Sequence, residues 1–401
     1  MSAPATATDV RLLRPGFVAW LGAATGSAVG DGVLYFALAW TASGLGPGAA
    51  TLVLVAGLVP EVALTLVGGV VADRWGVRRT LVASTAAMVG VLAGFLLALA
   101  TGVPMLALLV AVSVAQGVAT AFQGPAGSVV PRLFFPEAAV GRALALTGSV
   151  LSMARLVGPP LGAVVVVALS LGGVLVVDLV TFVVVLVVLR VVRPPYEAEP
   201  VAASGTARHD LAAGLRALRA APGMVPLLGS VALVAGGLLP LLALAVPLLV
   251  RERGWAAHDA GVIEACWIGG GLALSLAVAR LGTRDRARPP LVVGPVLAAA
   301  GAVGLAVAPH PPAAYGAALL MGVGTTVYTT HLFPLYLLRS PAEMQARFSS
   351  VLIVVQMVVL LLGTLAAGAA ATRFGIVPVL LGAAAVCATA GLPVLTSRTL
   401  R

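Results

Sequence analysis

Long uninterrupted apolar runs constrain this chain more than any other feature of its sequence. A helix of about twenty residues, at 1.5 Å per residue, covers the hydrocarbon core of a bilayer, which is roughly 30 Å thick. Runs of this length recur along the whole sequence, so we predict an all-α integral membrane protein. We place twelve helices at 16–40, 49–71, 80–101, 104–129, 143–169, 172–189, 225–249, 260–281, 291–308, 313–337, 349–371 and 375–395.

The composition fits a lipid environment. Of the 401 residues, 60% are hydrophobic and 9% are charged, whereas roughly a quarter of the residues of a soluble domain are charged. The net charge of +10 is scattered between the predicted helices, so we expect no nucleic-acid partner. Cys266 and Cys387 both fall within predicted helices, and we expect neither a disulfide, nor a metal site, nor a cofactor.

One long polar segment divides the predicted helices six and six. Residues 190–222 are polar and Pro-rich at their start, with a short amphipathic stretch around 211–218. Most other connections are short Gly/Pro turns. We therefore expect an N-terminal six-helix bundle (1–193), a cytoplasmic linker (194–222) and a C-terminal six-helix bundle (223–401).

The arginines predict the orientation in the membrane, since the chain has no lysine. If the N-terminus is cytoplasmic, 20 of the 24 basic residues fall in cytoplasmic segments, as the positive-inside rule requires. The N-terminal segment has no cleavage pattern of a signal peptide. We expect a monomer in a bacterial inner membrane, multi-pass, with both termini cytoplasmic.

An internal repeat can be read directly from two loops. The sequence RWGVR at 74–78 recurs as RLGTR at 280–284, an offset of 206. PEAAVGR at 136–142 matches PAEMQAR at 341–347, and Gly158 matches Gly363, both at an offset of 205. Parallel repeats of this kind build transporters with a site at the midplane between the halves.

The loop GGVVADRWGVRR, residues 68–79, resembles the signature between helices 2 and 3 of the major facilitator superfamily. The resemblance implies alternating access by two bundles, with this loop latching their inner ends in one conformation. A plain positive-inside turn is the alternative interpretation. The signature positions are Gly69, Asp73, Arg74, Gly76, Arg78 and Arg79.

Two further stretches are similar to drug exporters of this superfamily, especially the macrolide and siderophore branch. They are GDGVLYFALAW (30–40) and residues 116–163, which include the helix 5 packing positions Gly158, Pro159 and Gly162. The chain departs from the usual drug-antiporter pattern at Ser113, where an arginine is usual, and at Ala163, where a second glycine is usual. In the second copy of the loop signature, Ala279 stands where Asp73 would fall.

Charged residues inside predicted helices are functional hypotheses by default. Asp31 and Arg155 each lie about 15 residues from the cytoplasmic end, at roughly 22 Å depth, so they can pair. Asp31 is either a proton acceptor tuned by Arg155 or half of a static salt bridge. Glu61, after Pro60, is a further proton-site candidate with no partner at equal depth.

Other polar residues in the predicted helices have weaker assignments. We expect Asp178 and Glu264 to snorkel or cap near the outer helix ends. Amide, phenol and imidazole groups in the fourth, tenth and eleventh predicted helices could line an apolar cavity and orient a substrate. These candidates are Gln116, Gln123, Tyr328, His331 and Gln356.

Three classes of function remain open from the sequence. The first is a secondary exporter of amphipathic small molecules that exchanges them for protons. The second is an importer or uniporter of a small metabolite on the same fold. The third, a membrane enzyme or sensor, is disfavoured because the sequence has no Walker sequence, metal-spaced His/Cys cluster or soluble domain. Few charges in the spans suit a hydrophobic ligand better than a sugar or an anion.

Overall fold

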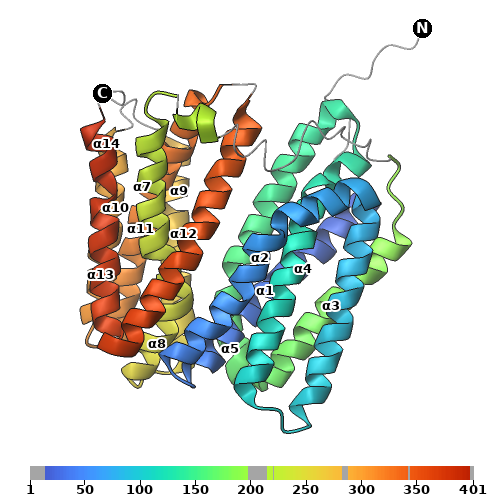
Figure 1. Ribbon diagram of the computed structural model, residues 1–401, viewed down its shortest axis with the longest axis horizontal. Helices are drawn as coiled ribbons and strands as arrows, with labels where there is room; N and C mark the ends of the chain where they lie inside the picture. Colours follow the sequence, from blue (N-terminus) through green and yellow to red (C-terminus); the bar gives the residue numbers. More distant parts are fainter. Residues whose placement is uncertain (1–13, 197–214, 220, 282–287, 342–343, 398–401) are drawn as a thin grey trace. The chain divides into compact units, whose positions relative to one another are not determined.

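The structure is a computed structural model that describes residues 14–196, 215–219, 221–281, 288–341 and 344–397. Every element in these ranges is helical (Figure 1). The elements are α1 (Pro15–Ser43), α2 (Pro47–Trp75), α3 (Val77–Leu99), α4 (Met105–Phe134), α5 (Glu137–Val191), α7 (Met224–Pro240), η1 (Leu241–Ala245), α8 (Val246–Glu252), α9 (Ala257–Leu281), α10 (Arg288–Val307), α11 (Pro311–Arg339), α12 (Gln345–Phe374), α13 (Ile376–Ala388), η3 (Thr389–Gly391) and α14 (Leu392–Thr396).

The described helices confirm the predicted twelve-helix membrane fold. Ten helical segments are long and apolar enough to cross a membrane. One of them, α5, is 55 residues long and contains two helices. The 29-residue α11 is also long enough to span, although its threonines make it more polar. Counting α5 as two helices and adding α11 brings the ten to twelve.

The backbone at Ser170 separates the two helices within α5. Its φ of 57° and ψ of −178° lie outside the helical region, in a conformation that side-chain-bearing residues rarely adopt. The chain reverses at this point, so residues 137–169 and 171–191 form the predicted fifth and sixth helices. Two other predicted helices are interrupted without a reversal. A π-helical turn, η1, follows Pro240 between α7 and α8, and η3 lies between α13 and α14.

The chain divides into two compact units. Unit 1 consists of Met1–Leu38 and Ala56–Ala202, and unit 2 consists of Ala39–Val55 and Ala203–Arg401. The end of α1 and the start of α2 therefore belong to unit 2. The predicted bundle boundaries at 193 and 223 stay a prediction, because most of the linker lies outside the described residues. Of the predicted amphipathic stretch at 211–218, residues 215–218 are described and helical.

Unit 1 has an aromatic core where α1 begins and α4 ends. Phe17 is fully buried and packs edge-on against Phe135, with ring centroids 4.8 Å apart. It also contacts Trp20 and Phe134. Arg14 donates a hydrogen bond to the Phe134 carbonyl at 2.9 Å, which ties the start of α1 to the end of α4.

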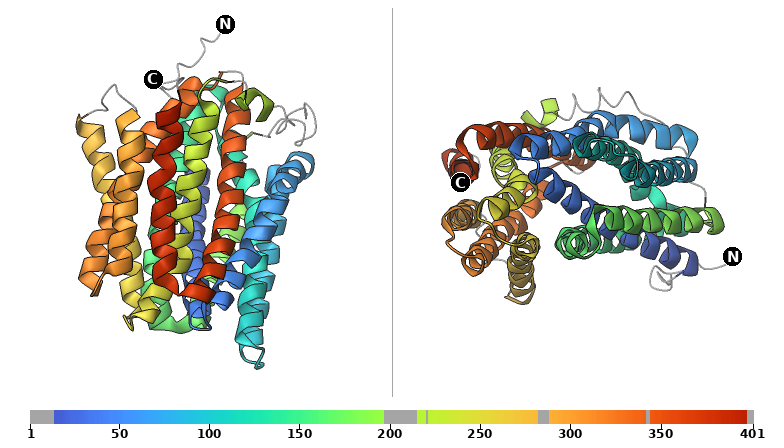
Figure 2. Two further views of the ribbon diagram at one scale, coloured as in Figure 1. Left: turned by 60° about the vertical axis from the view of Figure 1, so that its left-hand side comes forward. Right: turned by 90° about the horizontal axis from the view of Figure 1, so that it is seen from below.

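In unit 2, α10 packs against α11 and α13, and α11 also packs against α9 (Figure 1 and Figure 2). Arg251, near the end of α8, holds the end of α1. Its Nε donates to Ser43 Oγ at 2.8 Å, and its guanidinium lies 4.1 Å from the centre of the Trp40 ring. Cation–π stacking of this kind adds to the hydrogen bonds.

Candidate functional site

A close crossing of two helices positions the charged site of unit 1. Gly32 of α1 faces Gly158 of α5, and a Cβ added to Gly158 would lie 2.7 Å from the Gly32 Cα. A Cβ on Gly162, one turn further along α5, would lie 2.8 Å from Phe36 Cβ. Small residues let helix backbones approach this closely in lipid. The crossing places Asp31, next to Gly32, near Arg155, which precedes Gly158 by one turn.

Asp31 has a direct hydrogen-bond partner that the sequence did not suggest. Gln116 Nε2 of α4 donates to Asp31 Oδ1 at 2.6 Å. Within the described part of the chain no ion pair of 4.0 Å or less joins Asp31 to Arg155. Arg155 instead interacts electrostatically with both Asp31 and Glu61. In place of the expected ion pair, Arg155 is near two acids, Asp31 and Glu61, and the Gln116 amide is hydrogen-bonded to Asp31.

A cavity of about 330 Å³ opens beside this group. Asp31 and Arg155 both line it, together with Gln123 and several hydroxyl groups. Two polar atoms of these residues, Gln123 Nε2 and Thr147 Oγ1, are buried and have no hydrogen-bond partner among the described residues. Buried polar groups normally find a partner, so these two atoms are exceptions in the wall of the cavity. The apolar part of the wall consists of Trp20, Ala24, Ala28, Leu81, Leu144, Leu151, Val185 and Leu189.

The structure corrects the assignments of Asp178 and Glu264. Asp178, in the second helix of α5, is 0% exposed, and Glu264 in α9 is 7% exposed. Neither side chain reaches out of its helix bundle as a snorkelling residue would. Position along a helix does not determine which face a residue occupies, and both of these face inward.

The polar residues of α11 lie in unit 2, and the hydrogen bonds of Tyr328 and His331 are to other residues of this unit. The Tyr328 hydroxyl lies 2.9 Å from Ser230 Oγ of α7 in a buried pair. The imidazole of His331 approaches the Val327 carbonyl of its own helix at 2.9 Å. A second cavity, of about 90 Å³, is lined by Trp267, Tyr328 and Gln356, together with two threonines of α11 and apolar side chains. His331 is not part of either lining.

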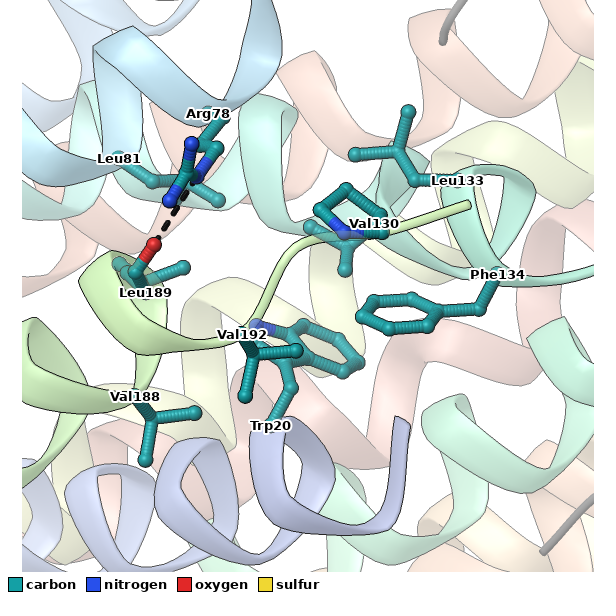
Figure 3. Close-up of a pocket in the computed structure, with 10 residues that line it drawn as sticks. Trp20, Arg78, Leu81, Val130, Leu133, Phe134, Val188, Leu189 and Val192 are labelled. Atoms are coloured by element: carbon teal, nitrogen blue, oxygen red, sulfur yellow. Dashed lines mark hydrogen bonds between the residues drawn. The ribbon is translucent and has the colours of Figure 1, made fainter. Parts of the chain in front are cut away.

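The loop signature makes its described contacts mainly through one arginine. Arg78 donates from Nε to the Leu189 carbonyl and from Nη2 to the Arg190 carbonyl, both at 3.0 Å. It thereby satisfies carbonyl groups at the end of α5, beside a small pocket that Trp20 also lines (Figure 3). Gly76, with a φ of 89°, makes the turn into α3, which glycine adopts at no steric cost.

The acid of the signature has no partner among the described residues. Asp73 is exposed near the end of α2, and no hydrogen bond or ion pair to its side chain is present in this part of the structure. A Cβ added to Gly69 would meet only the Cβ of Pro125, at 3.9 Å. Arg74 and Arg79 are exposed. Most of the second copy of the signature, RLGTR, lies outside the described residues.

Comparisons with known proteins agree with this arrangement. Residues 20–364 match the Major Facilitator Superfamily. No curated protein sequence matches the chain. Among solved structures, the fold is similar to a bacterial homologue of the human lysosomal transporter Spinster, in an inward-facing and unoccupied conformation. The TM-score is 0.75 and the identity 15%, over 96% of this chain and 98% of that chain.

Two other solved structures have the same fold. The nucleoside transporter NupG gives a TM-score of 0.73 at 10% identity, over 96% of this chain and 99% of that chain. A POT family transporter in complex with 5-aminolevulinic acid gives 0.71 at 11%, over 95% and 96%. These identities show the fold alone. With the match over residues 20–364, they identify the chain as a multi-pass membrane transporter, not an enzyme, that belongs to the major facilitator superfamily.

Proposed function

We propose that the chain exports amphipathic small molecules by alternating access and exchanges them for protons. The observation that carries this proposal is Asp31, an acid that lines the cavity of unit 1 with Arg155 in the same wall. A membrane acid open to a cavity can bind a proton and release it as the cavity changes access. The drug, macrolide or siderophore class of substrate comes from the sequence resemblance.

The cavity walls suit a molecule with both apolar and polar parts. Its volume of about 330 Å³ lies at the lower end of small-molecule sites, which bind mainly through apolar walls with a few placed polar groups. Gln123 and Thr147 are polar residues of its wall, and the carboxylate of Asp31 can bind a positively charged group of the substrate.

Gln116 can form a hydrogen bond with Asp31 whether Asp31 is ionised or protonated. An ionised carboxylate accepts hydrogen bonds only, and Gln116 Nε2 supplies one. Once Asp31 is protonated, its hydroxyl becomes a donor. Gln116 Oε1, which is buried and has no partner in the described part of the chain, can accept from it after the amide turns. The same two side chains therefore accommodate both states of the proton site.

The remaining parts of the proposal concern the whole cycle. We infer that the signature loop latches the inner ends of the two bundles, with Asp73 as its acid, and that both termini are cytoplasmic in a bacterial inner membrane. The protein acts as a monomer. Glu61, which shares Arg155 with Asp31, is the second acid able to take part in proton coupling.

Transport in liposomes tests this function. The probe is ethidium, a permanent amphipathic cation that a pH gradient alone does not concentrate. We expect purified protein to accumulate ethidium in vesicles that are acidic inside, because protons leaving drive the exchange. Asp31→Asn should abolish this accumulation and keep ethidium exchange without a gradient, since the cavity shape survives.

The outcomes that would contradict the proposal are specific. Accumulation only in vesicles that are acidic outside would indicate cotransport with protons, as in an importer. Equal accumulation with and without a gradient would indicate a uniporter. Recovery of gradient-driven transport in Asp31→Asn combined with Arg155→Gln would show that the charges are structural, and Glu61→Gln would then be the next variant to test.

A further inference from the structure

One buried acid of unit 1, Asp178, has no part in the proposed function. Asp178 is 0% exposed, and both of its carboxyl oxygens have no hydrogen-bond partner among the described residues. The nearby Thr181 hydroxyl donates instead to the main-chain carbonyl of Asp178, at 2.8 Å. An ionised carboxylate buried without a partner is costly, and such a group is far more stable when it holds a proton.

Gly30 brings this acid next to the proton site. A Cβ added to Gly30 would lie 2.8 Å from Asp178 Oδ1 and 2.9 Å from Thr181 Oγ1. The carboxyl group of Asp178 thus fills the space that a side chain on Gly30 would occupy. Because Gly30 directly precedes Asp31 in α1, the second helix of α5 places its acid against the backbone beside Asp31, and the two acids interact electrostatically.

The two acids have opposite surroundings. Asp31 receives a hydrogen bond from Gln116, lines the cavity and feels the charge of Arg155. Asp178 has no donor in the described part of the chain and does not line the cavity. Two like charges in one site resist simultaneous ionisation, and here the donor and the cation both favour placing the charge on Asp31.

We propose that Asp31 and Asp178 together form one proton site, with Asp178 holding a proton while Asp31 is ionised. The pair then carries a single negative charge, which Arg155 balances, while Glu61 is the other charged group near Arg155. This inference rests on the proposed proton antiport for its role in transport, but the presence of the proton on Asp178 is independent of it.

Infrared spectroscopy of the reconstituted full chain tests the site directly. The probe is the proton itself, and isotope-labelled aspartate shifts the carboxylic-acid C=O band of aspartates away from that of Glu264. At neutral pH we expect a labelled acid band in the wild type, lost in Asp178→Asn and kept in Asp31→Asn. The matched control, Glu264→Gln, should leave the labelled band unchanged.

The coupling of the two acids is tested by titrating that band. In Asp31→Asn the ionised neighbour is absent, so the band of Asp178 should disappear at a lower pH than in the wild type. Gly30→Ala should displace the carboxyl group and change the band. This second variant keeps the test open if Asp178→Asn fails to accumulate.

Three results would overturn the inference. They are a wild type without a labelled acid band, a band that Asp178→Asn leaves intact, and loss of the band on addition of sodium chloride at constant pH, which would indicate a sodium site. None of these measurements uses transport. Failure of ethidium antiport with the band assigned to Asp178 would therefore refute only the proposed function.

Discussion

The two units share a glycine-based helix crossing but differ in the ionisable residues at the positions that the repeat aligns. In unit 1, a Cβ on Gly158 would lie 2.7 Å from the Gly32 Cα, and in unit 2 a Cβ on Gly363 would lie 2.8 Å from the Gly236 carbonyl oxygen. Gly158 and Gly363 are the positions that the repeat aligns at an offset of 205. The duplicated element therefore uses the same glycine at the same helix crossing in both units.

The polar residues at the equivalent positions are not repeated. At the offset of 205, unit 2 has no acid or arginine where unit 1 places Asp31, Arg155 and Asp178, and Cys266 stands opposite Glu61. Packing constrains both copies, whereas a proton site is needed only once, so unit 1 carries the proposed coupling. The counterparts of Asp31, Gln116, Arg155 and Asp178 are Gly236, Met321, Leu360 and Ala383.

Enlarging the shared glycine tests the similarity of the two units and has the largest expected effect. Gly158→Val and Gly363→Val should each lower the free energy of unfolding by about 1–3 kcal/mol, because the new atoms overlap a neighbouring helix. Thermal unfolding in detergent measures the loss. Gly141→Val and Gly382→Val, where a Cβ has open space, are the matched controls. If only one of the two variants were destabilised, the two glycines would not have the same packing role.

Giving unit 1 the residue of unit 2 tests the difference in charge. Arg155→Leu places the counterpart residue, Leu360, in the cavity wall and leaves Asp31 and Glu61 without their shared cation. Gradient-driven ethidium transport should fall about tenfold, which corresponds to about 1.4 kcal/mol. Arg132→Leu, in the exposed last turn of α4, controls for loss of positive charge. Normal transport by Arg155→Leu would remove Arg155 from the mechanism.

The smallest effect is expected at the loop signature. Asp73 has no acid counterpart, since Ala279 aligns with it at the offset of 206. Asp73→Asn keeps the size of the side chain and removes its charge, so transport should fall about threefold at equal protein abundance, a coupling of less than about 1 kcal/mol. Glu137→Gln, at the exposed start of α5, is the control. Unchanged transport would reduce the signature to a topology signal.

The fold was predictable because apolar length alone determines which segments span a membrane. The predicted helix at 49–71 is α2, Pro47–Trp75, and its ends extend further because residues flanking the apolar run continue the helical hydrogen bonding. The kink at Ser170 falls in the gap between two predicted helices. No sequence pattern predicted its unusual backbone conformation.

The site was predictable only in part. Asp31, Arg155 and Glu61 stood out because charges are rare inside the spans. Depth along a helix indicated which residues lie at the same level, but the rotation of each helix decides which of them touch, and this rotation brought Gln116 to Asp31. The position of Asp178 depends on the space left by Gly30 on another helix, a long-range feature that no local pattern reveals.

Proton release on ligand binding tests most directly the claim that unit 1 carries the coupling. Ethidium is added to the purified protein in a weakly buffered solution, at a pH at which Asp31 and Asp178 both hold a proton, and the change in pH is recorded. We expect the wild type to release roughly one proton per ethidium bound, by linkage between the two ligands. Asp31→Asn should release none, while Glu264→Gln, which removes the buried acid of α9 in unit 2, should behave as the wild type. Release that persists in Asp31→Asn and disappears in Glu264→Gln would contradict the account.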